Sequence, residues 1–386
     1  MELDLGRGRS TRRTYGFDDV ALVPGAITLD PEKVDLACDL AGIELALPVL
    51  ASAMDAVVDV RSAAALTALG GLPVLNLHGL QCRYADPAPV FARIASASPE
   101  EAVSVLREAY REDLKEDLIL RRVEELREAG AKVAVSPTPA FAQRAADLIG
   151  PGKLEVLVVA STVTTARHVS SRYESPDFRR LADTVEAPVF VGNCVSYEAA
   201  LDLMRAGAHG VLVGVGPGAA CTTRRVLGIG VPQVTAAVDC AAARDDYQRE
   251  SGRRVPVILD GGMRVGGDIA KAIAAGADAV MIGSPLAMAE EAPGRGYHWG
   301  MATSDQELPR GTRVRVGVSG PMKQILLGPA ASDDGATNLF GALRLSMACC
   351  GARTLREMQK SEIVIAPALP SEGKGLQRAQ GVGGTK

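Results

Sequence analysis

The chain has 386 residues, of which 47% are hydrophobic and 23% charged, and its formal net charge at pH 7 is −4. This much apolar material supplies a large buried core and excludes a chain that is disordered throughout. The weakly acidic balance excludes a broad basic surface for nucleic acid or an anionic membrane, so any phosphate site must be local.

The seven cysteines are scattered, odd in number and without CxxC spacing, which argues against a disulfide framework or a structural zinc site. The first residues lack the apolar core of a secretory signal, and no run approaches the ~18 apolar residues of a membrane span. We therefore expect a cytoplasmic protein without nucleic-acid or membrane partners.

Short apolar runs rich in Val, Ile and Leu recur along the chain, and each is followed by a stretch of helical periodicity. This alternation is typical of βαβ units around a parallel sheet. Three AGA junctions (129–131, 206–208 and 275–277) place a glycine where a helix must turn into the next strand. The eight predicted strands are PVLASAM (48–54), GLPVLN (71–76), KVAVS (132–136), LEVLVVA (154–160), PVFVGN (188–193), GVLVG (210–214), PVILDGG (256–262) and DAVMIG (278–283).

Several of these runs have no internal polar residue, as expected for strands covered on both faces. We therefore predict a closed (β/α)8 barrel, the TIM barrel of the α/β class, whose chemistry lies at the carboxyl ends of the strands. Polar residues and glycines gather at those ends: Ser52, Met54, Asn76, Ser136, Asn193, Gly214, Asp260, Gly261, Gly262, Gly283 and Ser284.

We assign residues 1–370 to one catalytic barrel domain and residues 371–386 to a polar tail. Two stretches of the barrel domain fall outside the repeat. Residues 86–130 are strongly charged and predict a helical insertion before the third strand. Residues 295–335 carry Gly, Pro, Arg and Asp without periodicity and predict a flap.

The stretch GVGPGAACTTRRVLGIGVPQ (214–233) begins at the end of the sixth predicted strand. Gly216 and Gly218 leave room for a ligand to approach the backbone. A free cysteine is usually a small buried hydrophobe. A glycine-rich loop at a barrel strand end instead favours a nucleophile, and we predict that role for Cys221.

This loop resembles the catalytic loop of the IMP dehydrogenase and GMP reductase family, whose pattern is approximately GxGxGSxCxTRxxxGxGxPQ. TYGFDDVALVPG (14–25), LASAMDAV (50–57) and the stretch 257–294 resemble further family motifs in the same order, so the resemblance covers most of the chain. Residues 86–130 are too few to hold the paired regulatory CBS domains, which indicates the IMP dehydrogenase-related branch that lacks them.

The resemblance implies roles at matching positions. Cys221 is implied to attack carbon 2 of the purine and form a covalent adduct. Thr223 is implied to orient or deprotonate water or ammonia, although a loop threonine also commonly caps the following helix. The family's potassium-binding turn matches the carbonyls of Gly216, Gly218 and Cys221.

The resemblance further implies a purine nucleoside monophosphate as substrate. Its phosphate is implied at Gly261, Gly262, Gly283 and Ser284, because backbone N–H groups at helix starts favour an anion. Asp260 is implied at the ribose hydroxyls. Further positions implied around the nucleotide are Ser52, Met54, Asn193, Tyr297, Gly300 and Met301, of which the two methionines would equally fit a core.

The chain departs from the family pattern at three places. Ala219 replaces a phosphate-binding serine and removes a hydroxyl donor. Ala160 and Ser161 stand where the family often has an aspartate for the nicotinamide ribose, which leaves Ser161 as the predicted cofactor contact. No Arg-Tyr pair occurs in 295–335, so the base that usually hydrolyses the adduct in IMP oxidation is missing. Three arginines remain there as substitutes: Arg310, Arg313 and Arg315.

The missing pair favours reduction of GMP to IMP with NADPH and release of ammonia, with Glu307 as the acid or base. Oxidation of IMP to XMP with NAD, served by one of the three arginines, is the alternative. A weakly active nucleotide-binding regulatory protein is a further alternative, indicated by Ala219 and Ala160 together. The resemblance also implies a homotetramer or homo-octamer.

Overall fold

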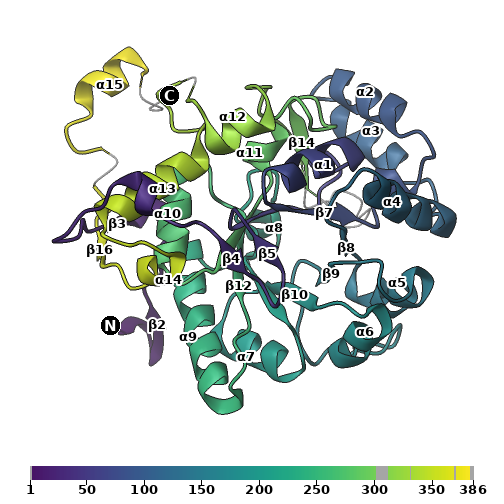
Figure 1. The fold of residues 1–386 in the computed structure, drawn as a ribbon, viewed down its shortest axis with the longest axis horizontal. Helices are drawn as coiled ribbons and strands as arrows, with labels where there is room; N and C mark the ends of the chain where they lie inside the picture. Colours follow the sequence, from purple (N-terminus) through teal and green to yellow (C-terminus); the bar gives the residue numbers. More distant parts are fainter. Residues whose placement is uncertain (1, 301–311, 331, 369–370, 383–386) are drawn as a thin grey trace.

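The computed structural model describes residues 2–300, 312–330, 332–368 and 371–382. Eight parallel strands close into a barrel in which the last strand pairs with the first, which confirms the predicted fold (Figure 1). Each strand lies inside one of the eight predicted runs or within one residue of it. The strands are β6 (Val49–Ala51), β7 (Leu72–Asn76), β8 (Ala134–Ser136), β9 (Val156–Ala160), β10 (Val189–Cys194), β11 (Gly210–Val213), β12 (Val257–Asp260) and β13 (Ala279–Ile282).

Helices surround the barrel, and the alternating side chains of each strand supply two apolar layers. Residues such as Phe190, Leu212 and Ile258 fill the barrel, whereas Val191 and Leu259 pack against the helices. The AGA glycines Gly130, Gly207 and Gly276 all adopt positive φ angles, as the helix-to-strand junctions required. The surrounding helices are α1 (Val60–Ala68), α4 (Glu116–Glu128), α5 (Ala142–Ile149), α6 (Phe178–Val185), α7 (Tyr197–Arg205), α9 (Gln233–Ser251), α10 (Gly266–Ala274) and α13 (Leu339–Cys349).

The amino end of the barrel is closed by a short hairpin. Strands β4 (Cys38–Asp39) and β5 (Glu44–Leu45) cross the front of the barrel in Figure 1. Leu40, Ile43 and Leu45 of this hairpin join the apolar cluster of the barrel interior. A ligand therefore has access to the barrel only from the carboxyl end.

The charged stretch 86–130 contains three helices, of which two are additional to the barrel. Helix α4 packs between α1 and α5 and buries Leu118, Ile119 and Val123, so it is the second helix of the barrel itself. The additional helices are α2 (Ala88–Ser96) and α3 (Ala102–Ala109). We call residues 88–109 the helical insertion.

The described part of 295–335 contains regular elements that the sequence did not predict. Strands β14 (Tyr297–Trp299) and β15 (Arg313–Arg315) pair antiparallel on either side of 301–311, and α12 (Met322–Leu327) follows. Met301, Glu307 and Arg310 lie outside the described residues.

The chain ends lie on one side of the barrel. Strand β16 (Ile363–Ile365) pairs with β3 (Val20–Leu22), and α15 (Gly375–Gln380) stands away from the barrel in Figure 1. Among the helices of the described ranges, none combines the length and apolarity needed to cross a bilayer. The remaining short elements are β1 (Glu2–Gly6), β2 (Arg9–Arg12), α8 (Thr223–Leu227), α11 (Ser284–Ala287) and α14 (Leu355–Met358).

Candidate active site

A cavity of about 560 Å³ lies at the carboxyl ends of the barrel strands. Its volume is within the range of small-molecule sites. Tyr297 is not among the described residues that line it. The structure brings the following sequence-predicted residues together in its lining: Ser52, Met54, Ser161, Asn193, Gly216, Gly218, Cys221, Thr223, Asp260, Gly261, Gly262, Gly283, Ser284 and Gly300.

The loop after β11 holds Cys221 half-buried in the cavity wall. The Cys221 backbone N–H donates to the Gly218 carbonyl at 3.0 Å, and its thiol donates to the Thr223 hydroxyl at 3.1 Å. Thr223 is the buried first residue of α8, and its hydroxyl contacts the thiol instead of capping that helix. The arrangement provides a nucleophile with a proton-exchanging hydroxyl beside it.

The Arg224 side chain holds the two ends of this loop together. Its guanidinium donates to the carbonyl of Val215 at 2.9 Å and to that of Val231 at 2.8 Å, so one side chain joins the start and the end of the loop. Because the loop is tied at both ends, the position of Cys221 is fixed relative to β11.

Two glycine turns, one directly after β12 and one directly after β13, form one end of the cavity. Gly261 and Gly262 have φ angles of 77° and 85°, which L side chains rarely adopt. A Cβ atom on Gly283 would lie 2.8 Å from Met54 Sδ, so glycine is needed there for close packing. The turns belong to paired neighbouring strands, and glycine turns before helix starts are suited to an anion. Within the first turn the Gly261 N–H already donates to the Met281 carbonyl at 2.9 Å.

Gln233, which the sequence analysis did not single out, fixes the first of these turns. Its side-chain amide donates to the carbonyl of Asp260 at 3.0 Å and to that of Gly261 at 3.1 Å. Its buried position at the start of α9 explains why the PQ dipeptide closes the loop motif.

Asp260 is the carboxylate at the end of β12. Burial raises its pKa to about 6, and the hydrogen bond donated by the Asn193 amide at 2.7 Å opposes that rise. Because the carboxylate form is not paired with a cation among the described residues, it is suited to accept hydrogen bonds from a ligand.

The opposite end of the cavity contains polar side chains that the sequence analysis did not assign. His78 lies there with Arg83, Ser136 and Thr138. The Thr138 backbone N–H donates to His78 Nε2 at 3.1 Å, so that ring nitrogen is an acceptor. Burial, assisted by the charge of Arg83, lowers the pKa of His78 to about 4 and keeps the imidazole neutral.

His298 on β14 forms another part of the wall. It is 1% exposed, and its Nε2 lies 3.0 Å from the Ser284 hydroxyl. Burial lowers the pKa of His298 to about 4, so it also is neutral near pH 7. The contact joins β14 to the glycine turn after β13.

Within the described ranges, no cluster of three His, Cys, Asp or Glu side chains is arranged to hold a metal ion. The monovalent cation at the carbonyls of Gly216, Gly218 and Cys221 stays a prediction. The Gly218 carbonyl already accepts the Cys221 N–H within the same turn.

Comparison with known proteins shows what this chain is similar to. A model described as the IMP dehydrogenase / GMP reductase domain matches residues 14–369. An uncharacterized oxidoreductase of Mycolicibacterium smegmatis is 38% identical over 94% of this chain and 99% of its own length. The inosine-5′-monophosphate dehydrogenase of Methanocaldococcus jannaschii is 30% identical over 92% of this chain and 94% of its own length.

The crystal structure of an IMP dehydrogenase/GMP reductase-like protein from Corynebacterium glutamicum superposes with a TM-score of 0.88. The two chains are 34% identical, and the match covers 95% of this chain and 98% of that one. The alignment with the archaeal enzyme runs over 481 positions, more than the 386 residues present here, so that enzyme carries residues without a counterpart. This agrees with the predicted branch without regulatory domains.

Proposed function

This chain belongs to the IMP dehydrogenase / GMP reductase family of oxidoreductases, and from that premise we propose that it reduces GMP to IMP with NADPH and releases ammonia. The observation that carries the proposal is the Cys221 thiol, hydrogen-bonded to Thr223 in the wall of a cavity with an anion-suited end.

The nucleotide is held by the two glycine turns and by Asp260. Its phosphate meets the backbone N–H groups of Gly262 and Gly283 together with the Ser284 hydroxyl, whereas Gly261, whose N–H donates to the Met281 carbonyl at 2.9 Å, shapes the turn. The Asp260 carboxylate accepts hydrogen bonds from the ribose hydroxyls. This orientation directs the base toward Cys221, which lines the same cavity.

The reaction proceeds through a covalent bond between Cys221 and carbon 2 of the purine. The thiolate attacks carbon 2 of GMP, and the exocyclic amino group takes up a proton and leaves as ammonia. A hydride then bonds to carbon 2, and the bond to sulfur breaks, which returns the thiolate and yields IMP. Thr223, whose hydroxyl lies 3.1 Å from Sγ, passes the proton to the departing amine.

The far end of the cavity fits the nicotinamide cofactor that supplies the hydride. Ser161, Thr162 and Thr138 present hydroxyl groups there, and His78 presents a neutral ring. Arg83 adds a positive charge, and the described residues of this end include no carboxylate. The Arg83 guanidinium donates to the carbonyls of His78, Tyr110 and Glu112, so it holds the wall of this end in place. The choice of NADPH over NADH rests on the proposed reductive direction.

The reductive direction is supported by the missing Arg-Tyr pair and by the contacts of Arg313. Oxidation of IMP requires a base to activate water, and the sequence offers no Arg-Tyr pair. Arg313 donates to the carbonyls of Ile94 and Ala97 and lies over the Tyr297 ring at 4.6 Å. With its guanidinium committed to these contacts, Arg313 is unsuited to that role. Reduction needs no hydrolysis.

The test uses purified protein with matched substrate pairs. We expect GMP with NADPH to yield IMP, ammonia and oxidised cofactor in equal amounts, and intact mass spectrometry to find a purine adduct that is absent from Cys221→Ser. XMP formed only from IMP and NAD would refute the direction and leave the family assignment in place. Nucleotide binding without turnover in either direction would refute the enzymatic proposal in favour of a regulatory protein.

A further inference from the structure

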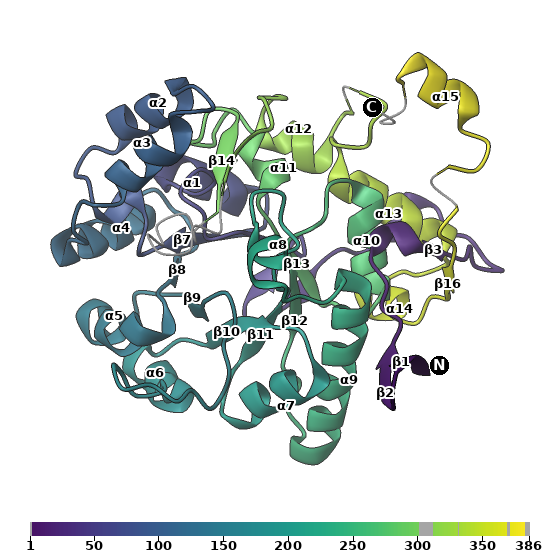
Figure 2. The same ribbon diagram turned by 180° about the vertical axis from the view of Figure 1, so that it is seen from behind.

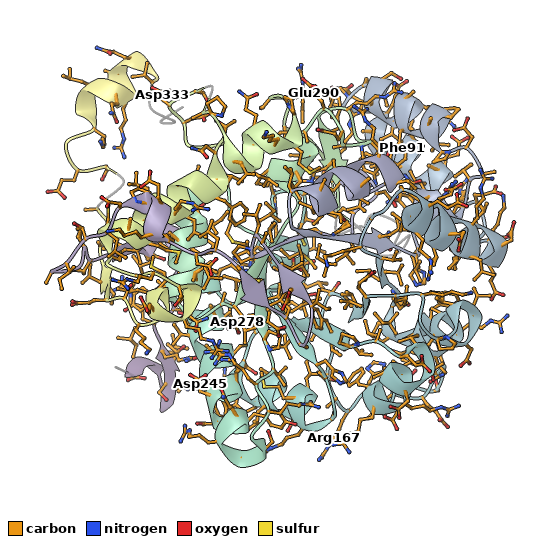
Figure 3. The ribbon with its side chains drawn as sticks, in the orientation of Figure 1. Phe91, Arg167, Asp245, Asp278, Glu290 and Asp333 are labelled. Carbon is orange, nitrogen blue, oxygen red and sulfur yellow. The ribbon has the colours of Figure 1, made fainter. Side chains whose placement is uncertain are left out.

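The helical insertion is joined to the active-site wall by a separate small core. Phe91 and Ile94 of α2 and Leu106 of α3 pack with Tyr110 around the buried side chain of Trp299 on β14. Both ribbon views place β14 beside α2 and α3, and Phe91 is labelled in that region in Figure 3 (Figure 1, Figure 2). The insertion therefore supports β14 directly.

A buried chain of hydrogen bonds crosses this core. The Trp299 indole N–H donates to the Tyr110 hydroxyl at 2.8 Å, and the Tyr110 hydroxyl donates to Asp55. Asp55 is 1% exposed and follows the predicted nucleotide contact Met54. Tyr110 thus joins β14 to the carboxyl end of β6 through one oxygen atom.

The partner strand β15 is attached to the same insertion. Arg313 donates to the carbonyls of Ile94 and Ala97 at the end of α2, the latter at 2.8 Å. In the β14–β15 pair Arg313 stands opposite Trp299. Both strands of this hairpin are therefore anchored on residues 88–110.

The anchoring has a direct consequence for the nucleotide end of the cavity. Adjacent residues of a strand point to opposite sides, so Trp299 faces the insertion while His298 faces Ser284 at 3.0 Å. Gly300, the next residue, lines the cavity. A shift of the Trp299 side chain would move His298 and Gly300 with it.

We propose that Tyr110 and Trp299 are positioning residues through which the helical insertion sets the nucleotide end of the active site. They act on the substrate through His298, Ser284 and Gly300 on the β14 side, and through Asp55 beside Met54 on the β6 side. The inference rests on the proposed function for the identity of the nucleotide, and the experiment below separates the two.

Tyr110→Phe tests the proposal because it keeps the aromatic ring and removes the shared oxygen. We expect the KM for GMP to rise about tenfold, the effect of a lost buried hydrogen bond, with the KM for NADPH within about twofold of wild type. Tyr84→Phe is the matched control. Its hydroxyl donates to the Ala109 carbonyl at 2.9 Å, beside the same core but outside the chain to Trp299.

Trp299 is the only tryptophan in the sequence, so its fluorescence reports on this contact alone. Emission in Tyr110→Phe should shift to shorter wavelength, and the change in emission on GMP binding should shrink. Both signals should be kept in Tyr84→Phe. A purely structural role of Tyr110 would lower the unfolding midpoint without changing the KM for GMP, which would overturn the proposal.

If Tyr110→Phe does not fold, Trp299→Phe replaces it. This variant keeps an aromatic ring against Phe91 and should show the same rise in KM; an unchanged KM would overturn the proposal. A wild-type protein that binds GMP without turnover refutes the proposed reaction, and the GMP dissociation constants of the variants then replace KM. A wild-type protein that binds neither GMP nor IMP overturns both proposals.

Discussion

Two partly buried aspartates on neighbouring strands show how differently the two ends of the barrel are built. Asp278 immediately precedes β13 at the amino end, and Asp260 ends β12 at the carboxyl end. The Asp278 carboxylate forms ion pairs with Arg244 at 2.9 Å and with Arg254 at 2.7 Å (Figure 3 labels Asp278 in this cluster). The Asp260 carboxylate accepts one hydrogen bond from a neutral group, the side-chain amide of Asn193.

The pKa shifts of the two carboxyl groups follow this difference. Burial acts to raise both pKa values, but at Asp278 the charges of Arg244 and Arg254 outweigh it and the pKa is lowered. At Asp260 no cation of the described residues opposes the effect of burial, and the pKa rises to about 6. A carboxylate whose charge is paired within the fold stabilises the fold, whereas a partly buried carboxylate without a cation lowers stability. This difference is the one expected if the amino end contributes stability and the carboxyl end binds the proposed nucleotide.

The largest effect is expected from Asp278→Asn. Removing the charge leaves two largely buried guanidinium groups with only the exposed Asp245 as an ionic partner, which should lower the free energy of unfolding by about 3 kcal/mol. Denaturant titration measures the change, and kcat and KM of the folded protein should stay near wild type. Asp245→Asn is the control, because that carboxylate contacts the same Arg244 but is 55% exposed, and we expect a loss below ~1 kcal/mol. Equal losses in the two variants would contradict the comparison.

Asp260→Asn should leave stability intact and lower activity, the reverse of the effect expected for Asp278→Asn. Asparagine can still accept the Asn193 hydrogen bond, so the free energy of unfolding should be unchanged or higher near pH 7. Loss of the charged acceptor for the ribose hydroxyls should lower kcat/KM about 30-fold, which corresponds to a charge-assisted hydrogen bond of ~2 kcal/mol. Steady-state kinetics with GMP and NADPH measure this, and a destabilised but fully active variant would contradict the assignment.

The pH dependence of stability should have opposite signs at the two ends. The folded-state pKa of Asp260 lies above its ordinary value of 3.8. The contribution of Asp260 to the free energy of unfolding therefore falls as the pH rises from about 4 to about 6, and it is constant at higher pH. The folded-state pKa of Asp278 lies below 3.8, so its stabilisation is complete above that pH and is lost in stronger acid.

Differences between wild type and each asparagine variant isolate these contributions. The shifted groups Asp55, His78 and His298 remain in every protein and cancel. Urea titrations between pH 3 and pH 7 should therefore show the Asp260 difference changing between about pH 4 and about pH 6, and the Asp278 difference changing with the opposite sign only below pH 3.8. Curves of the same sign would show that one of the two environments is misassigned.

Much of the fold was predictable because each barrel strand is a short, uninterrupted apolar run. Helix α4 was grouped with the insertion because its periodicity is the same whether a helix packs on the barrel or beside it. Strands β14 and β15 have three residues each and are separated by residues 300–312, so neither shows a pattern of its own.

The site residues also fall into those that the sequence predicts and those that it does not. Cys221, Asp260 and the glycines follow strand ends directly, where sequence order predicts position in a barrel. His78 was missed because its environment depends on Thr138, 60 residues away. His298 was missed because its contact with Ser284 exists only once β14 is seated on the insertion.

The smallest expected effect concerns Ala219, the position at which the chain lacks the hydroxyl of the family pattern. Ala219 is exposed and lines the cavity, so Ala219→Ser adds a donor at the nucleotide end without burying a polar group. One added hydrogen bond to phosphate is worth about 1 kcal/mol, and the KM for GMP should fall about fivefold. The free energy of unfolding should change by less than ~0.5 kcal/mol, as is usual for surface positions.

Ala219→Val is the control for this last prediction, because valine adds bulk at the same position without a hydroxyl group. We expect the KM for GMP to rise or stay constant in the valine variant. If both variants lower the KM, the gain comes from stiffening the loop through added bulk, and the missing hydroxyl is not what limits nucleotide affinity. If neither does, the phosphate is held by the glycine turns alone, and the carboxyl end is already complete without the serine.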